Sequence, residues 1–261
     1  MKFGIAMATA ADAWKLVQRA EEIGFSYAWF YDTQMLSADC FVAMGAAAVR
    51  TERIRLGTGV LIPSNRIAPV TANALATLNQ LAPGRVDFGV GTGFTGRRAM
   101  GLGAMKLADM EEYIRIVYDL LDGELLEAEF EGRKKKIKFL NPELGLINIR
   151  DPISLHISAY GPKSRSLVAK LGAAWLNFVG DVEGDADDVA DVDKLNVVPG
   201  LDNLTGDFVT EDRLYVGNDS KTCSRDGLWT GTRLNWRKQR YKRIRYKLEH
   251  LSGSKYTYII F

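Results

Sequence analysis

The chain has 261 residues, 47% of them hydrophobic and 25% charged, with a formal net charge of +2. This is the composition of an ordinary globular protein, and the length suffices to bury a large core as one domain. Two cysteines, Cys40 and Cys223, cannot form a disulfide framework, and their spacing matches no zinc pattern. The sequence has neither the apolar segment of a signal peptide nor about 20 consecutive apolar residues for a membrane span. We therefore expect a soluble, cytoplasmic protein with no metal site and no membrane partner.

The charge is distributed unevenly along the chain. Residues 221–261 contain eleven basic and two acidic residues, a net charge of +9, whereas the other 220 residues carry 23 basic and 30 acidic residues, a net charge of −7. A split of this size calls for separate explanations of the two parts. We predict a regular portion over residues 1–182 and a divergent segment over residues 183–261, acidic first and basic afterwards.

Through the first 180 residues, short apolar β-prone runs alternate with longer segments of helical periodicity. The apolar runs predict strands at KFGIAMA, YAWFYD, IRLGTGVLI, RVDFGVGTG, SLHISAY and AAWLNFVG. The spacing of apolar side chains predicts helices over residues 12–24, 39–50, 68–81, 107–121 and 164–171. After residue 181 this alternation ends, and KLNVVPGL and DRLYVG are the candidates for further short strands.

Strands that are apolar on both faces indicate a parallel sheet covered by helices, and therefore an α/β fold. A (β/α)8 barrel of the TIM-barrel type and a doubly wound open sheet both satisfy this pattern. We favour the barrel, with its last two βα units incomplete or altered. The reason is that polar residues or glycines recur at the carboxyl ends of successive strands, where barrels build their sites: Asp32, Gly57/Gly59, Gly91/Gly93 and Ser158/Gly161. Residues 125–150 interrupt the alternation and predict an insertion after the fourth helix, a hairpin on the rim of the barrel.

Several motifs follow one another in order: KFGIAM, AEEIGFSYAWFYD, IRLGTGVLIPSNRIAPVTANALATLNQLAPGRVDFGVGTG and HISAYGPKSRSLVAKLGAAWLN. Over residues 1–182 they resemble the bacterial luciferase-like superfamily, in particular the branch that includes methylenetetrahydromethanopterin reductase. The resemblance implies an oxidoreductase or monooxygenase that uses FMN or the deazaflavin coenzyme F-420. Such an enzyme transfers hydride or activates dioxygen on a small organic substrate.

The resemblance also implies where the flavin ring would lie. Similar proteins have a cis peptide bond at a position that corresponds to Gly59–Val60, where it would bulge behind the ring and hold it bent. The alternative is that these glycines merely let the end of the strand turn. In the loop after the fourth strand, Thr92 and Gly93 would lie near the cofactor.

The segment SAYGPKSRSL joins the fifth strand to the next helix. The hydroxyl groups of Ser158 and Ser164, the amide of Gly161, the charge of Lys163 and free N–H groups at a helix start suit a phosphate. An ordinary N-capped loop is the alternative. The resemblance assigns this segment to the flavin phosphate, with cofactor-binding residues Ser158, Ala159, Gly161, Pro162, Lys163 and Ser164.

Asp32 ends the aromatic second strand. A carboxylate at the rim can accept a hydrogen bond from a ring edge or act as a general base, so Asp32 is a candidate for cofactor binding and for catalysis. Its alternative role is to cap the loop that follows. Many family members have His directly after this acid, whereas this chain has Thr33, which argues against proton transfer by histidine. We interpret His156, inside the fifth strand, as a strand residue with a satisfied ring.

Three hypotheses for function stay open at this point. The leading one is the flavin- or F-420-dependent oxidoreductase, which would act on a small-molecule substrate and could form a homodimer. The second is a flavin-binding barrel relative that catalyses nothing. The third is a damaged copy in which the residues after about 181 come from an altered reading frame. The basic segment LNWRKQRYKRIRYKLEH matches no nucleic-acid-binding module, so we do not expect a nucleic-acid partner.

Overall fold

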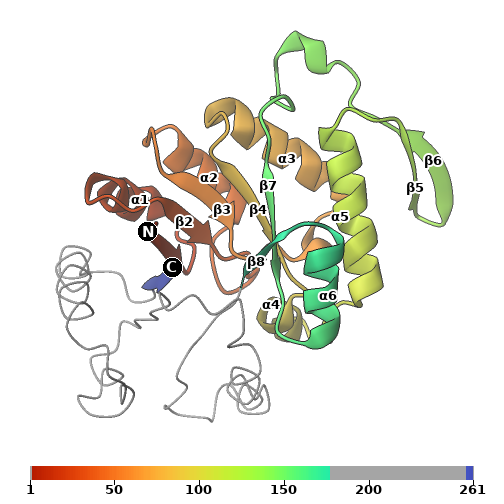
Figure 1. The fold of residues 1–261 in the computed structure, drawn as a ribbon, viewed down its shortest axis with the longest axis horizontal. Coiled ribbons are helices and arrows are strands. Elements are labelled where there is room, and N and C mark those ends of the chain that lie inside the picture. Colours follow the sequence, from red (N-terminus) through yellow and green to blue (C-terminus); the bar gives the residue numbers. More distant parts are fainter. Residues whose placement is uncertain (1, 177–256, 261) are drawn as a thin grey trace.

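The structure is a computed structural model that describes residues 2–176 and 257–260 (Figure 1). Within these residues, seven strands form one sheet in the order β8-β7-β4-β3-β2-β1-β9. Their bounds are β1 (Gly4–Met7), β2 (Tyr27–Phe30), β3 (Arg55–Thr58), β4 (Val86–Val90), β7 (Ser154–Ser158), β8 (Ala174–Leu176) and β9 (Thr257–Ile260). The α-helices are α1 (Ala13–Glu22), α2 (Cys40–Ala48), α3 (Ala68–Leu81), α4 (Phe94–Ala99), α5 (Leu107–Leu121) and α6 (Pro162–Lys170). Two short 3-10 turns are η1 (Pro63–Asn65) and η2 (Pro142–Leu144).

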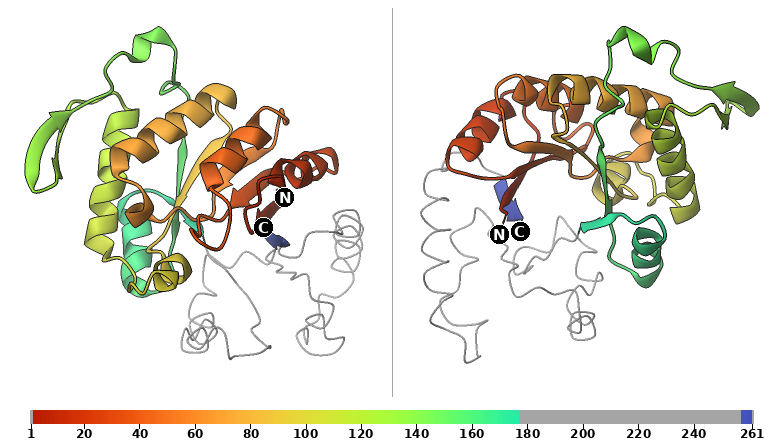
Figure 2. Two further views of the ribbon diagram at one scale, coloured as in Figure 1. Left: turned by 180° about the vertical axis from the view of Figure 1, so that it is seen from behind. Right: turned by 45° about the horizontal axis from the view of Figure 1, so that its top comes forward.

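From β1 to β8 the sheet is parallel, and each strand pairs with the previous strand of the same sheet. A doubly wound sheet would reverse its strand order at a switch point, and these strands show no reversal. The sheet is curled, and α1, α2, α3 and α5 cover its outer, convex face (Figure 2). The predicted barrel-type α/β fold is therefore confirmed, in the form of a half-barrel. The predicted changes in the last two βα units, the two further strands and the boundary at residue 182 lie outside the described residues.

One edge of the sheet departs from the barrel pattern. Strand β9 pairs with β1 in the antiparallel direction, with Gly4 opposite Ile260 and Met7 opposite Thr257. All strands of a (β/α)8 barrel run parallel. Strand β9, the neighbour of β1 at this edge, is therefore not a regular barrel strand.

The core lies between the convex face of the sheet and the helices. Val17 and Ala20 of α1, three residues apart, are both fully buried, and so are Phe30 of β2 and Phe88 of β4. Burying a side chain of the size of Val or Phe stabilises the fold by about 1.5–3 kcal/mol. The bounds of α3 and α5 equal the predicted ranges, because both helices have clear apolar faces that pack against each other.

The predicted insertion forms an antiparallel hairpin of β5 (Leu126–Phe130) and β6 (Arg133–Ile137). Glu127 lies opposite Lys136 and Glu129 opposite Lys134, so opposite charges pair across the strands. The predicted position on the rim is wrong. Helix α5 runs antiparallel to the strands and returns the chain to their amino-terminal ends, where the hairpin projects from the body (Figure 1).

Candidate functional site

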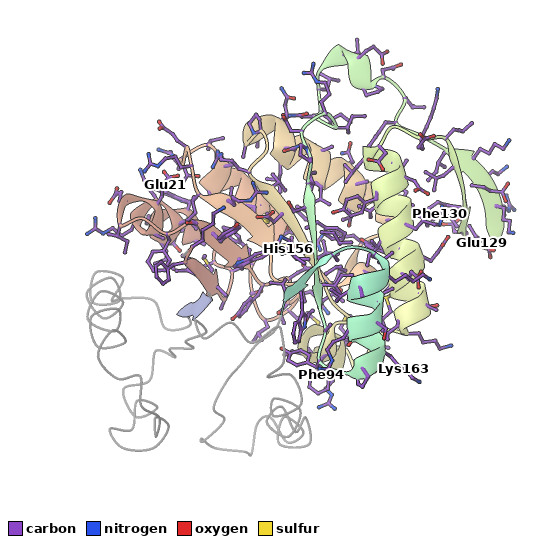
Figure 3. The ribbon with its side chains drawn as sticks, in the orientation of Figure 1. Glu21, Phe94, Glu129, Phe130, His156 and Lys163 are labelled. Carbon is purple, nitrogen blue, oxygen red and sulfur yellow. The ribbon has the colours of Figure 1, made fainter. Side chains whose placement is uncertain are left out.

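The carboxyl ends of β2, β3, β4 and β7 lie along one edge of the half-barrel, because these strands are parallel neighbours. We call this edge the rim. All the residues predicted to bind the cofactor lie at the carboxyl ends of these four strands or in the segments that follow them. Figure 3 shows Phe94 and Lys163 at the rim, and His156 higher up within the sheet. The structure therefore brings the predicted residues to one side of the molecule.

The segment after β3 contains the peptide bond between Gly59 and Val60, which is cis, as the resemblance implied. The Gly59 N–H donates to the carbonyl oxygen of Phe30 at 2.7 Å, which ties this segment to β2. A Cβ atom built on Gly91 would stand 2.7 Å from Cγ2 of Val60 and 3.3 Å from Cβ of Ser158. Val60 and Ser158 thus meet over Gly91, and the ends of β3, β4 and β7 converge there.

The turn at Thr92 and Gly93 follows β4. Gly93 has a φ of +79°, in the left-handed region that favours glycine. A Cβ atom at Gly93 would also stand 2.5 Å from Cγ2 of Ile62, so glycine is required there by space as well. The Thr92 carbonyl oxygen accepts a hydrogen bond of 2.9 Å from the Met105 N–H, which closes the segment 92–105 at its base.

The segment after β7 leads into α6. Ala159 is buried, and its carbonyl oxygen accepts a hydrogen bond of 2.6 Å from the indole N–H of Trp175. Helix α6 begins at Pro162, after Gly161, without a side-chain cap. The Ser164 hydroxyl donates to the Gly161 carbonyl oxygen at 2.9 Å, and Lys163 is exposed. An uncapped helix start beside an exposed lysine side chain favours an anion.

Asp32 is buried and surrounded by donors. One guanidinium nitrogen of Arg66 lies 2.9 Å from each carboxylate oxygen of Asp32. The backbone N–H of Ile62 donates to the same carboxylate at 3.1 Å, and the thiol of Cys40 lies 3.6 Å from it. Burial and the negative charge of Asp32 raise the pKa of the Cys40 thiol well above its usual range, so the thiol stays protonated. Asp32 therefore joins the segments that follow β2 and β3.

Arg66 makes a second ion pair at the start of α2. Its other terminal nitrogen lies 2.5 Å from Asp39, whose side chain also caps α2 by accepting from the Phe41 and Val42 N–H groups. Burial lowers the pKa of Arg66, but its hydrogen bonds and charge pairing with Asp32 outweigh burial and raise it. The guanidinium group is therefore a permanent cation between two carboxylates.

Sequence reasoning did not identify two rim residues, Gln34 and Asn65. The Asn65 amide nitrogen donates to the Gln34 side-chain oxygen at 2.7 Å, and the Gln34 amide nitrogen donates to the Gly96 carbonyl oxygen at 2.7 Å. Each is a single amide side chain in a short segment between a strand and the next α-helix, and such a residue carries no local signal. Their positions after strand ends could have marked them, but many loop residues share that property.

A charged cluster lies on the inner face of the sheet. Arg55 donates to the two carboxylate oxygens of Asp87 at 2.9 and 2.7 Å, and the Nε2 atom of His156 lies 3.5 Å from the same carboxylate. The His156 ring meets Trp29 edge to face, with centroids 4.9 Å apart. Burial raises the pKa of Asp87, but the hydrogen bonds from His156 and Arg55 outweigh burial and lower it overall. His156 has partners on the inner face, which agrees with its interpretation as a satisfied strand residue.

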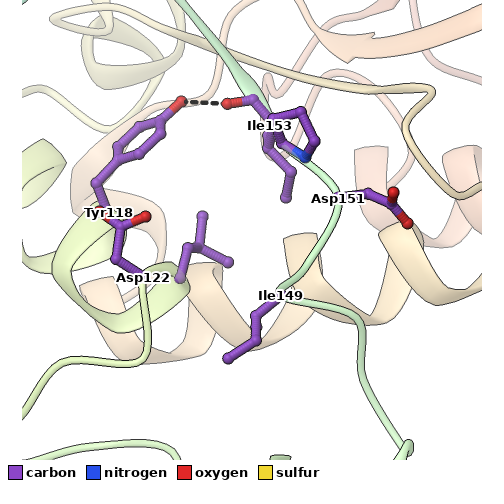
Figure 4. Close-up of a pocket in the computed structure, with 7 residues that line it drawn as sticks. Tyr118, Asp122, Ile149, Asp151 and Ile153 are labelled. Carbon is purple, nitrogen blue, oxygen red and sulfur yellow. Dashed lines mark hydrogen bonds between the residues drawn. The ribbon is translucent and has the colours of Figure 1, made fainter.

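A separate depression of about 110 Å³ lies near the opposite ends of the strands (Figure 4). It is bordered by the end of α5 and by the residues that lead into β7, and the Tyr118 hydroxyl donates to the Ile153 carbonyl oxygen at 3.0 Å. In barrels the amino-terminal face carries stability and the carboxyl-terminal face carries the site. We therefore do not assign the cofactor to this depression.

The curled parallel sheet and the rim geometry define a half-barrel of the (β/α)8 type, a fold class that builds its sites at the carboxyl ends of its strands. The chain belongs to the luciferase-like monooxygenase family, whose model matches residues 3–244. It is similar to a 5,10-methylenetetrahydromethanopterin reductase of Archaeoglobus fulgidus, with 32% identity over 66% of this chain and 51% of the relative. It is also similar to an F-420-dependent glucose-6-phosphate dehydrogenase of Beutenbergia cavernae, with 35% identity over 51% of this chain and 40% of the relative.

Among solved structures, the fold is similar to that of the coenzyme F-420-dependent tetrahydromethanopterin reductase of Methanopyrus kandleri. The TM-score is 0.54 and the identity 25%, over 64% of this chain and 52% of that one. The chain thus spans about half the length of the relatives that it matches. Residues 2–176 and 257–260 contain no helix with the length and apolarity of a membrane span. The same residues contain no group of three or more His, Cys, Asp or Glu side chains that could hold a metal ion.

Proposed function

We propose that this protein is an oxidoreductase that binds coenzyme F-420 or FMN at the rim and acts on a small organic substrate. The observation that carries the proposal is the convergence of Val60, Gly91 and Ser158 beside the start of α6. The names of the similar reductase and dehydrogenase support F-420 as the cofactor. FMN is the other flavin that the sequence resemblance implied. Because the chain spans about half of those relatives, activity, substrate and partners are all part of the proposal.

The residues at the start of α6 fit the phosphate of such a cofactor. A Cβ atom on Gly161 would meet nothing within 4 Å, so the approach to the helix start is open. The first N–H groups of α6 and the ammonium group of Lys163 would attract the phosphate, and the Ser164 hydroxyl lies in the same turn. Ser158, Ala159 and Pro162 would line this end of the cofactor.

At the ring end, the proposed contacts are Gly59, Val60, Thr92 and Gly93. The cofactor supplies the hydride or dioxygen chemistry, and the protein supplies position and electrostatics. Asp32 was the predicted catalytic residue. Its carboxylate is held by Arg66 and the Ile62 N–H, so we propose that it mainly positions the segments around the ring.

We also propose that the protein is cytoplasmic and forms a homodimer. Apolar side chains support self-association: Val42 on α2 is 71% exposed, and Ile67 and Val70 at the start of α3 are 59% and 51% exposed. These two helices are neighbours, because Arg66 pairs with Asp39 between them. Light scattering after size-exclusion chromatography would give the mass, and a monomer would contradict the homodimer.

The experiment that tests the function is a titration of the full chain with F-420 and with FMN, followed by cofactor fluorescence. We expect micromolar binding of one of them, and consumption of the reduced cofactor with a carbonyl or dioxygen acceptor. Binding without turnover over a broad acceptor panel would instead support a non-catalytic flavin-binding protein. A folded protein that binds neither cofactor would overturn the proposal.

A further inference from the structure

Three segments of the rim are joined by a chain of side-chain amides. Asn65, after β3, donates to Gln34, after β2, and Gln34 donates to the carbonyl oxygen of Gly96, after β4; both distances are 2.7 Å. We call this chain, Asn65–Gln34–Gly96, the rim clasp. Its two hydrogen bonds connect residues 31 and 62 positions apart in sequence, so they are tertiary contacts that join η1, the segment after β2 and α4.

The rim clasp is anchored at its Asn65 end. The Asn65 amide nitrogen also lies 3.3 Å from the carboxylate of Asp32, which the ion pair with Arg66 holds in place. Both polar atoms of the Gln34 side chain are used, the oxygen as an acceptor and the nitrogen as a donor. Glutamate could still accept from Asn65 but could not donate to Gly96, whereas methionine could not donate and its sulfur is only a weak acceptor.

At its other end the rim clasp reaches a tightly packed turn. A Cβ atom on Gly96 would stand 2.5 Å from Cδ1 of Ile62 and 3.1 Å from the Gln34 side-chain oxygen. Gly96 belongs to the same helical turn as Gly93, since the Gly93 carbonyl oxygen accepts from the Arg97 N–H at 3.0 Å. A bond that fixes Gly96 therefore also restrains Gly93, which, like Gly96, lies close to the Ile62 side chain.

We propose that Gln34 is a positioning residue for the cofactor site, acting through the rim clasp on the segment 92–105. In this role Gln34 does not contact the cofactor. It holds the Thr92–Gly93 turn in the position in which this turn can contact the cofactor ring. The ligand in this inference rests on the proposed function, whereas the restraint on segment 92–105 does not.

The test compares Gln34→Met and Gln34→Glu with wild type in the full chain. Gln80→Met, on the exposed part of α3, is the matched control. Hydrogen exchange would follow residues 92–105, thermal unfolding would follow overall stability, and fluorescence titration would give the dissociation constants of F-420 and FMN. Both variants lose the neutral hydrogen bond to the Gly96 carbonyl oxygen, and this loss predicts about 3- to 10-fold faster exchange in this segment and a similar rise in the dissociation constant. Unfolding temperatures would stay close to those of the control, which separates positioning from a general loss of stability.

Unchanged exchange over residues 92–105 in both Gln34 variants would overturn the rim clasp, whatever the cofactor result. Faster exchange with unchanged affinity would overturn the link to the cofactor site. If wild type bound neither cofactor, the proposed function and the cofactor part of this inference would fail together, and exchange would still decide the restraint on its own.

Discussion

Arg66 lies 2.9 Å from both carboxylate oxygens of Asp32, and the two side chains are 16% and 4% exposed. Two residues that follow different strands are thus joined by an ion pair that water hardly reaches. Removing one member of a buried pair leaves the other charge without compensation, and this costs more than the intact pair contributes.

The first prediction concerns this pair. Replacing Arg66 with leucine should lower the free energy of unfolding by about 3 kcal/mol, because Asp32 would stay buried without its cation. The measurement is urea denaturation of wild type and variant. Arg115→Leu is the control, since Arg115 pairs with Glu112 and Asp119 on the exposed face of α5, where about 0–1 kcal/mol is expected. An equal decrease in the free energy of unfolding of the two variants would show that the buried ion pair contributes no more to stability than the exposed one.

The second prediction concerns the convergence at Gly91. Gly91→Ala would place a methyl group 2.7 Å from Val60, and the stiff valine side chain cannot rotate away. We expect a destabilisation of about 1–3 kcal/mol from overpacking, together with weaker cofactor binding. Gly45→Ala is the control, because a Cβ atom there meets nothing within 4 Å in the interior of α2. That substitution should stabilise the protein by about 0.5–1 kcal/mol. If Gly91→Ala unfolded like wild type, Val60 would not be held in its observed place.

The third prediction concerns acid stability. The pKa of Asp87 lies below its ordinary value of 3.8, so its ion pair stabilises the fold fully above that pH. The contribution is lost as the pH falls further, through the lowered pKa of the folded state. The free energy of unfolding, measured from pH 6 downwards, should therefore fall less steeply at the acid end for Asp87→Asn than for wild type. At pH 6 the variant should be less stable than wild type, because Arg55 loses its partner. The exposed Asp12→Asn should keep the wild-type slope. If the free energy of unfolding of Asp87→Asn fell with pH as steeply as that of wild type, other carboxyl groups would account for the acid sensitivity.

The fourth prediction concerns the phosphate end of the site. Lys163→Ala should raise the dissociation constant of the cofactor roughly tenfold, the cost of a charge-assisted contact. Lys170→Ala, at the other end of α6 and paired with Glu111, should have no such effect. The titration should be repeated at two salt concentrations, because the contribution of Lys163 should shrink as salt screens it. If both lysine variants bound alike, the phosphate would have to lie elsewhere.

The fold was largely predictable because its signals are local and repeated. The apolar spacing in α3 and α5 specified both ends of each helix, and the parallel sheet followed from strands that are apolar on both faces. The hairpin was predicted but placed at the wrong end, since the return direction of α5 depends on how the helix packs. The contacts of Asp32 could not be predicted either, because Arg66 reaches it across 34 positions in the sequence. Gln34 gave no signal, because its role depends on two partners that packing alone brings near.

The strand order described above has a consequence for how the chain reaches its fold. Strands β2, β3 and β4 each pair with the strand made just before them, so the first four strands can assemble in the order of synthesis with short loop closures. Strand β7, in contrast, is separated from β4 by more than 60 residues, and all of these must be synthesised before β7 can pair with β4. Until then β4 has a free edge, and an unpaired edge invites association with other chains. The β4 edge is therefore open to association with other chains throughout the synthesis of α5 and the hairpin, an interval set by topology and not by the stability of the finished protein.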